Sequence, residues 1–171
     1  CFVREVRSQE AEAPRLNLLD QLQPLPGLPG LGGEDLSLHA EFRMAEGARE
    51  GRLAITAMIG QGWHLYSITQ KSGGPMRSVI KVAPSEQFEV IGSFQPNRPP
   101  KIKNYEFFSV PVEEHDGELV WTAPIKLKQS VDPATLEIKI NFEGQVCQDS
   151  GVCIPKQETL TARFAGTYEV A

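Results

Sequence analysis

The sequence has no apolar run that could span a membrane and no concentration of positive charge. A membrane-spanning helix needs about 18 or more consecutive apolar residues, and no stretch of this 171-residue chain approaches that length. The formal net charge is −5 and the basic residues are scattered. Nucleic-acid binding is not expected, because a phosphate-binding surface needs clustered Lys and Arg. The Gly-x-Ser-x-Gly pattern of many hydrolases is also missing.

The first residues lack the apolar central region of an export signal. We interpret the chain as a piece of a longer exported protein, with the signal, and a fused membrane domain or lipid anchor, outside this fold. Cysteine is scarce, with three residues in all. If two of them bond, Cys1 is the odd one. It is either the lipid-bearing first residue of a bacterial lipoprotein or the place where the sequence happens to begin.

Residues 1–33 differ in composition from the rest. The leucine spacing over 14–22, with Pro14 in the first turn, predicts a short amphipathic helix. Residues 24–33 are rich in Pro and Gly and predict a linker. We therefore predict an amino-terminal extension over 1–33 that tethers or spaces a single domain over 34–171.

From residue 36 onward, apolar and polar residues alternate in short runs separated by turn signals. Such alternation is typical of half-buried strands. The dipeptide Asp116-Gly117 predicts a tight hairpin turn between two of them. Eight or nine short strands at this spacing predict an all-β fold, an immunoglobulin-like antiparallel β-sandwich. The predicted strands are 36–44, 53–59, 63–68, 76–82, 88–94, 107–112, 118–127, 135–146 and 160–164.

Cys147 and Cys153 lie in the connection between two alternating segments. Gly151 permits a positive φ inside the connection and Pro155 stiffens its exit. Cysteines at such a place can close a small ring without moving the sheet, so the pair could switch between thiols and disulfide. As a purely structural bond, the same ring would stabilise the fold by about 2–3 kcal/mol. The local features therefore leave a redox role and a structural role equally open.

The surroundings predict weakly activated thiols. No helix start lies nearby to lower a thiol pKa, Asp149 opposes thiolate formation, and Lys156 is the only cation close in sequence. This favours a passive electron carrier over a strong oxidant. The acidic run at 113–116 is interpreted as a solvated turn rather than a metal site, and no metal is expected.

Three motifs resemble one known family. Phe142-Glu-Gly-Gln-Val-Cys-Gln-Asp-Ser-Gly-Val-Cys-Ile-Pro155 is similar to the active-site hairpin of the amino-terminal periplasmic domain of the thiol:disulfide interchange protein DsbD. Gly62-Trp-His-Leu-Tyr66 is similar to a Gly-aromatic-x-Leu-Tyr strand of that family, and Tyr105-Glu-Phe-Phe108 to its acidic-aromatic cap segment. The resemblance covers about residues 36–166.

The resemblance implies an immunoglobulin-like sandwich with a redox-active disulfide and no cofactor. It implies a thioredoxin-like domain, fed from the membrane, as electron donor. The implied acceptors are periplasmic disulfide isomerases or thioredoxin-like proteins of cytochrome c maturation. Cys153 would form mixed disulfides and Cys147 would resolve them.

The resemblance also implies a shield over the sulfurs. Phe107 in the first place, with Phe108 as the alternative, would cover them within a cap that includes Glu106, and Tyr66 would line the site beside the hairpin's Asp149. His64 stands where the family has a tyrosine. An imidazolium there could lower a thiol pKa, but we favour the interpretation of His64 as a surface residue.

Two alternatives stay open. One is a non-catalytic immunoglobulin-like binding or spacer module whose disulfide is structural. The other is a lipid-anchored chaperone that holds a metal or cofactor through the two thiols.

Overall fold

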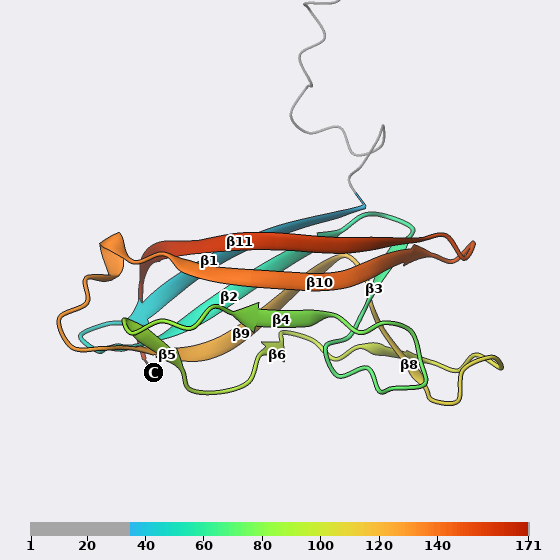
Figure 1. Ribbon diagram of the computed structural model, residues 1–171, viewed down its shortest axis with the longest axis horizontal. Helices are drawn as coiled ribbons and strands as arrows, with labels where there is room; N and C mark the ends of the chain where they lie inside the picture. Colours follow the sequence, from blue (N-terminus) through green and yellow to red (C-terminus); the bar gives the residue numbers. More distant parts are fainter. Residues whose placement is uncertain (1–34, 171) are drawn as a thin grey trace, which may run out of the picture. The chain divides into compact units, whose positions relative to one another are not determined.

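The computed structural model describes residues 35–170, which form a β-sandwich with one short 3-10 helix (Figure 1). The predicted helix at 14–22, the linker at 24–33 and Cys1 lie outside the described residues. The boundary between extension and domain therefore stays a prediction. No helix within residues 35–170 is long and apolar enough to cross a membrane.

The strands belong to two sheets joined through the last strand, β11. Sheet A pairs β5 and β6 with β9, and continues through β2 and β1 to the end of β11. Sheet B pairs the start of β11 with β10, which also pairs with β3 and β4, and continues through β8 to β7. The strands are β1 (Leu36–Ala45), β2 (Glu50–Ile59), β3 (Trp63–Tyr66), β4 (Val79–Val82), β5 (Phe88–Val90), β6 (Gln95–Pro96), β7 (Lys101–Lys103), β8 (Val112–His115), β9 (Glu118–Leu127), β10 (Ile138–Gln148) and β11 (Cys153–Tyr168).

Alternating side chains from the two sheets meet in the core. In β9 every second residue from Leu119 to Leu127 is buried, and in β10 the apolar face runs through Ile138, Ile140 and Phe142. The rings of Trp121 and Phe142, one from each sheet, lie 6.0 Å apart. The predicted immunoglobulin-like β-sandwich is confirmed, with one pair, β1 with β11, running parallel rather than antiparallel.

Two predicted strands were misplaced. The segment 107–112 is mostly loop, and the strand there is β8 at Val112–His115. Its start follows Pro111, which has no N–H to donate to a sheet. The predicted strand 160–164 is only the middle of β11, which extends through the exposed segment after Cys153 because β10 pairs with it residue by residue.

The Asp116-Gly117 turn is not a hairpin. Gly117 has the expected positive φ of 63°, but β8 pairs with β3 and β7, whereas β9 pairs with β2, β5 and β6. The turn carries the chain from sheet B to sheet A. Local turn chemistry predicted the bend correctly, but it could not show which strands pair.

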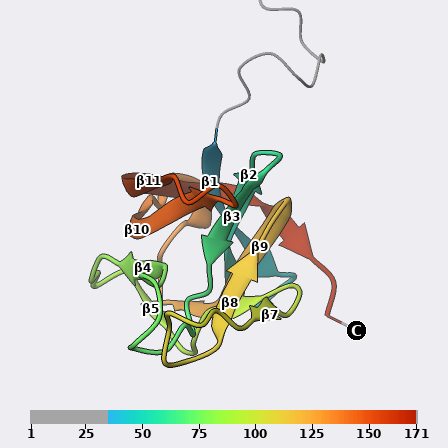
Figure 2. The ribbon, with the colours of Figure 1, turned by 90° about the vertical axis from the view of Figure 1, so that its right-hand side faces the viewer.

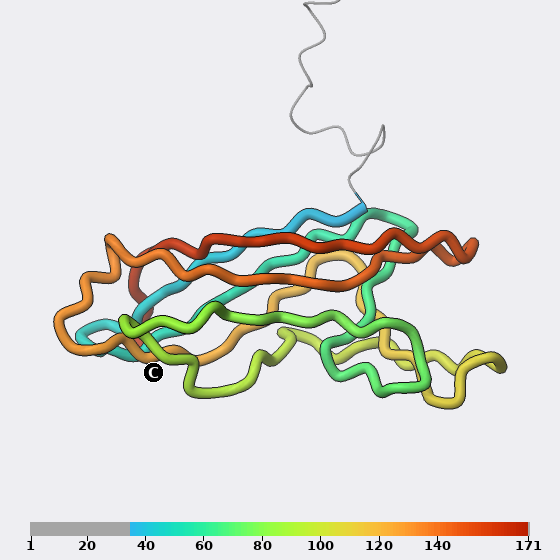
Figure 3. The backbone as a smooth tube through the Cα atoms, viewed as in Figure 1, coloured from blue at the N-terminus to red at the C-terminus, as the bar shows by residue number. Residues whose placement is uncertain are grey.

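One end of the sandwich gathers three segments that are distant in sequence. Viewed toward that end, β10 and β11 lie side by side, and β3 leads from them toward β8 (Figure 2). The tip of the β10–β11 hairpin and the loop between β7 and β8 project at this same end (Figure 3). This end is where the cysteine pair lies.

Candidate functional site

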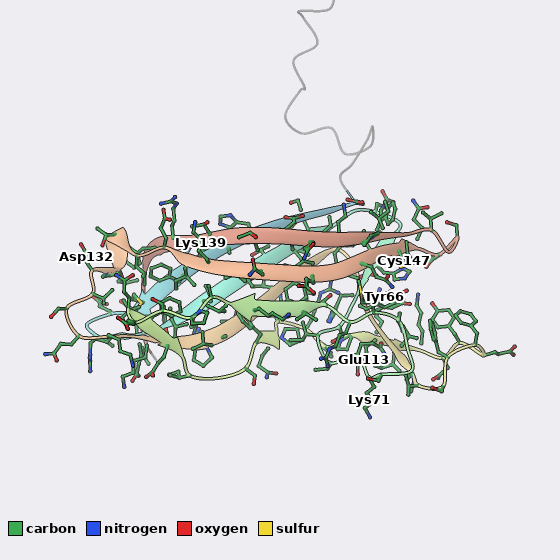
Figure 4. The ribbon with its side chains drawn as sticks, viewed as in Figure 1. Tyr66, Lys71, Glu113, Asp132, Lys139 and Cys147 are labelled. Carbon is green, nitrogen blue, oxygen red and sulfur yellow. A yellow bond between two sulfur atoms is a disulfide. The ribbon has the colours of Figure 1, made fainter. Side chains whose placement is uncertain are left out.

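The cysteine pair closes the tip of the β10–β11 hairpin. Cys147 and Cys153 are direct cross-strand partners, bonded through sulfurs 2.09 Å apart, with Cα atoms 4.1 Å apart. The connecting turn is held by the Gln148 N–H, which donates to the Val152 carbonyl at 2.8 Å, and Gly151 takes the expected positive φ of 93°. Figure 4 shows Cys147 close to Tyr66 at this end of the molecule.

The two sulfur-bearing residues differ in exposure. Cys147 is 1% exposed and belongs to a small apolar cluster with Tyr66 and Val112. Cys153, at the start of β11, is exposed. An approaching thiolate therefore has access to the Cys153 side of the bond.

A turn at residues 105–108 covers the buried sulfur. The Phe108 N–H donates to the Tyr105 carbonyl at 3.1 Å, so Glu106 and Phe107 occupy the turn's corner. Tyr105 and Phe108 pack against the cluster that contains Cys147. Phe107 contacts the Phe108 ring at 4.7 Å between centroids but is itself 77% exposed.

Glu106 does not line the site. Corner residues of a turn point outward, and Glu106 is accordingly exposed. The carboxylate that the fold brings beneath the cap is Glu114 on β8. The order of residues in the cap motif did not indicate that Glu114, and not Glu106, would lie beneath the cap.

A cavity of about 540 Å³ lies between the turn and the hairpin. Both cysteines reach it, and so do both cap phenylalanines. The fold thus leaves space beside the disulfide that a partner side chain could enter. The lining residues are His64, Tyr66, Pro75, Lys103, Tyr105, Phe107, Phe108, Gln145, Cys147, Gln148, Asp149, Gly151 and Cys153.

Glu114 is the charged centre under the cap, although it is only 3% exposed. Its two oxygens accept from the Tyr105 hydroxyl at 2.9 Å and from the Lys103 ammonium at 2.7 Å. The hydrogen bond to Glu114 raises the pKa of Lys103, and burial, with the same carboxylate, raises the pKa of Tyr105. The buried carboxylate therefore holds both partners in their protonated forms.

His64 is buried rather than at the surface, so that interpretation was wrong. It is 8% exposed and lies on β3, which pairs with β10 and β8 in the interior of sheet B. Its Nε2 lies 3.3 Å from the Tyr66 hydroxyl and 3.7 Å from Glu114 Oε1. Its Nδ1 lies 3.6 Å from Asp149 Oδ1.

Tyr66 sits beside the disulfide as the resemblance implied. Burial, followed by the nearby Glu114 carboxylate, raises the pKa of Tyr66 to about 12. Its backbone carbonyl accepts from the Ser78 hydroxyl at 2.6 Å. Tyr66 is therefore a fixed, protonated phenol at the base of the cavity.

The cation near the disulfide is Lys103, not Lys156. The Lys156 ammonium binds Asp35 at 2.7 Å, whereas Lys103 lines the cavity and reaches within 4.0 Å of Asp149. The interpretation of 113–116 as a solvated turn was also wrong for Glu114 and His115, which are buried in β8. No local sequence pattern indicates that Lys103 or Glu114 belongs to the site, because both lie outside the cysteine motif and strand pairing places them near it.

Within residues 35–170, no three His, Cys, Asp or Glu side chains are grouped in a way that could hold a metal ion.

A solvent-facing sulfur opposite a buried one, on a β-sandwich and under an aromatic turn, is the arrangement of a thiol–disulfide exchange domain. The chain belongs to a family of that class: residues 36–165 match the model of the N-terminal domain of the thiol:disulfide interchange protein DsbD.

Two solved structures are similar to the chain. One is the N-terminal domain of DsbD from Neisseria meningitidis in its reduced form, 18% identical, with a TM-score of 0.45, over 74% of this chain and 84% of that chain. The other is the N-terminal periplasmic domain of ScsB from Proteus mirabilis, 18% identical, with a TM-score of 0.46; the match covers 74% of this chain and 44% of that one. No match is found among the curated proteins.

Proposed function

We propose that this domain works in the reducing direction, passing electrons to disulfides of exported proteins through Cys147 and Cys153. The family supports thiol–disulfide exchange, and the unequal exposure of the two cysteines is the observation that supports their separate roles. An exported bacterial location fits the family. Attachment to a membrane, through a fused domain or a lipid anchor outside the fold, is part of the proposal.

The proposed reaction has two steps. The exposed Cys153 thiolate attacks a substrate disulfide, forming a mixed disulfide and releasing one substrate thiolate. The Cys147 sulfur then attacks Cys153, re-forming the intramolecular bond and releasing the second substrate thiolate. Two electrons pass from the domain to the substrate.

The partners follow from the family resemblance. A thioredoxin-like domain, itself fed from the membrane, is the proposed donor. A periplasmic disulfide isomerase or a thioredoxin-like protein of cytochrome c maturation is the proposed acceptor. No cofactor is required, because the exchange involves only sulfur atoms.

The cap gives the reaction its selectivity. Tyr105 and Phe108 pack against the cluster with Cys147 and also line the cavity beside Cys153, so they narrow the approach of small thiols to the bond, and a protein partner displaces them as it docks. The exposed Phe107 ring is then available to contact the partner. Lys103 and Tyr105 tie this turn to Glu114, so the shield has a defined closed position.

Trapping of mixed disulfides tests the assignment of the two sulfurs. Cys147→Ala leaves the exposed Cys153 thiol with no resolving partner, and we expect it to capture a thioredoxin-like protein as a stable, reducible adduct. Cys153→Ala leaves only the buried Cys147 and should capture far less. Both variants should carry Cys1→Ser so that the third thiol cannot react, and adducts would be compared on non-reducing gels.

Capture by neither single variant would overturn the exchange role and favour the spacer module with a structural bond. Stronger capture by Cys153→Ala would reverse the assignment of attacking and resolving sulfurs.

A further inference from the structure

The buried position of Cys147 raises a charge problem in the proposed reaction. When a reductant attacks Cys153, the bond breaks and Cys147 leaves as a thiolate. This residue is 1% exposed and packs with Tyr66 and Val112. An unpaired charge in such surroundings is costly unless a neighbouring group neutralises it.

His64 is the titratable side chain placed to do this. It is the direct cross-strand partner of Cys147 in the β3–β10 pair. Paired residues project to the same face of a sheet, with Cβ atoms about 4.5–5.5 Å apart. Both residues line the cavity beside the disulfide.

Charged groups from three neighbouring segments lie around His64. Carboxylates of Glu114 from β8 and Asp149 from the hairpin turn lie 3.7 and 3.6 Å from opposite ring nitrogens. An imidazolium carries a donor on each nitrogen, which matches acceptors on both sides. Lys103 from β7 lines the same cavity, with its ammonium bound to Glu114.

The remaining neighbours do not replace His64 in this role. The Tyr66 hydroxyl lies 3.3 Å from Nε2, and burial raises the pKa of Tyr66 to about 12. Such a phenol gives up its proton far less readily than an imidazolium. Tyr105 already donates its hydroxyl to Glu114.

We propose that His64 exchanges a proton with Cys147 in each round of the reaction, an inference that rests on the proposed exchange function. As a thiolate attacks Cys153, the His64 imidazolium gives its proton to the departing Cys147 sulfur, leaving a neutral thiol and a neutral imidazole. In the forward reaction toward a substrate, neutral His64 takes the proton back as Cys147 attacks the mixed disulfide. Glu114 and Asp149 are positioning residues that keep the ring beside the sulfur.

The test is the pH dependence of disulfide reduction by dithiothreitol in the 171-residue chain carrying Cys1→Ser. Rates are divided by the thiolate fraction of dithiothreitol at each pH, which removes the titration of the reagent. We expect the normalised rate of the parent protein to fall in a step across the range in which histidine side chains generally change charge, about pH 5 to pH 8. In His64→Gln this step should disappear, and the normalised rate at the acidic end should drop by about tenfold or more.

His39→Gln is the matched control. His39 also lies near a carboxylate, with Nε2 3.6 Å from Glu41, but it is an exposed side chain on β1. It should keep the parent profile. His64→Phe provides a second variant if His64→Gln does not fold, since it keeps a planar ring without a titrating group.

A normalised profile that is identical in parent and His64 variants would overturn the proposal. So would a step that persists in both variants. These outcomes are separate from failure of the proposed function: dithiothreitol reports on His64 even if no thioredoxin-like donor reduces the domain, and loss of donor reactivity in the parent protein would count against the function alone.

Discussion

At the scale of single residues, the site depends on which side chains cover each sulfur. Phe107 and Phe108 are adjacent in sequence, yet Phe108 packs against the cluster containing Cys147 while Phe107 is 77% exposed. The turn geometry explains the difference, because position 107 is a corner and position 108 closes the turn hydrogen bond. The family resemblance favoured Phe107 as the shield, whereas the ring that packs against the cysteine cluster is Phe108.

Phe108→Ala should speed reduction of the disulfide by glutathione several-fold, because it removes a ring that limits access to the sulfurs. Phe107→Ala is the matched control and should change the rate less, since that ring faces solvent. Stopped-flow reduction of the two folded variants would measure this. Equal rates in the parent and Phe108→Ala, or a larger effect from Phe107→Ala, would show that the shield is elsewhere.

How well the site could be predicted depends on how far apart its residues lie in the sequence. The glycine turn between the cysteines was predicted, because its determinants lie within a few residues of one another, but both cysteines lie in the paired strands β10 and β11 and not in the connection between strands. Glu114 and Lys103 were missed. Lys103 lines the cavity beside the disulfide, and Glu114 binds Lys103 and Tyr105, only because β8 pairs with β3 and β7. No local pattern encodes that pairing.

At the scale of elements, strands with a clean two-residue alternation were predicted well. The run at 118–127 coincides with β9, because its buried face repeats without interruption. The strand predicted at 107–112 was wrong, because its aromatic residues belong to the cap turn and not to the face of a sheet. The segment after Cys153 was not predicted as a strand, although it is one. Its residues are mostly exposed, and its strand conformation comes from pairing with β10.

Strand β8 carries a buried histidine that makes stability depend on pH. Burial, followed by the positive charge of Arg98, lowers the pKa of His115 to about 4, against the nearby carboxylates of Glu113 and Asp116. Within residues 35–170 neither ring nitrogen has a hydrogen-bond partner. Between about pH 4 and pH 6.5, the His115 ring is therefore neutral in the folded state and largely protonated in the unfolded chain.

We expect the free energy of unfolding to fall as pH drops from about 6.5 to about 4, by up to about 3 kcal/mol, because the unfolded state binds the extra proton in this window. Urea denaturation across that range measures it. His115→Asn should flatten the dependence, whereas His39→Asn, at an exposed position, should keep it. An unchanged slope in His115→Asn would contradict the assignment. Asp35 and Asp116, whose pKa values are lowered by their lysine partners, act only below this window.

At the scale of the whole molecule, the disulfide is placed where it can open without disturbing the fold. The β10–β11 ladder runs from Ile138–Ala162 to the cysteines themselves, so the bond adds a link at the tip of strands that are already paired. The main core cluster, which contains the Trp121–Phe142 pair, includes neither cysteine. Oxidised and reduced forms should share one sandwich, as a reversible carrier requires.

The reduction potential of the Cys147–Cys153 pair, measured in the folded domain against glutathione and thioredoxin, tests this account most directly. We predict a value above about −300 mV, with full exchange in both directions, because inert structural disulfides lie below that limit. The circular dichroism of the sandwich should be unchanged across the titration. A potential below that limit, or a bond that no physiological reductant opens while the protein stays folded, would contradict the account and leave a β-sandwich with a structural staple.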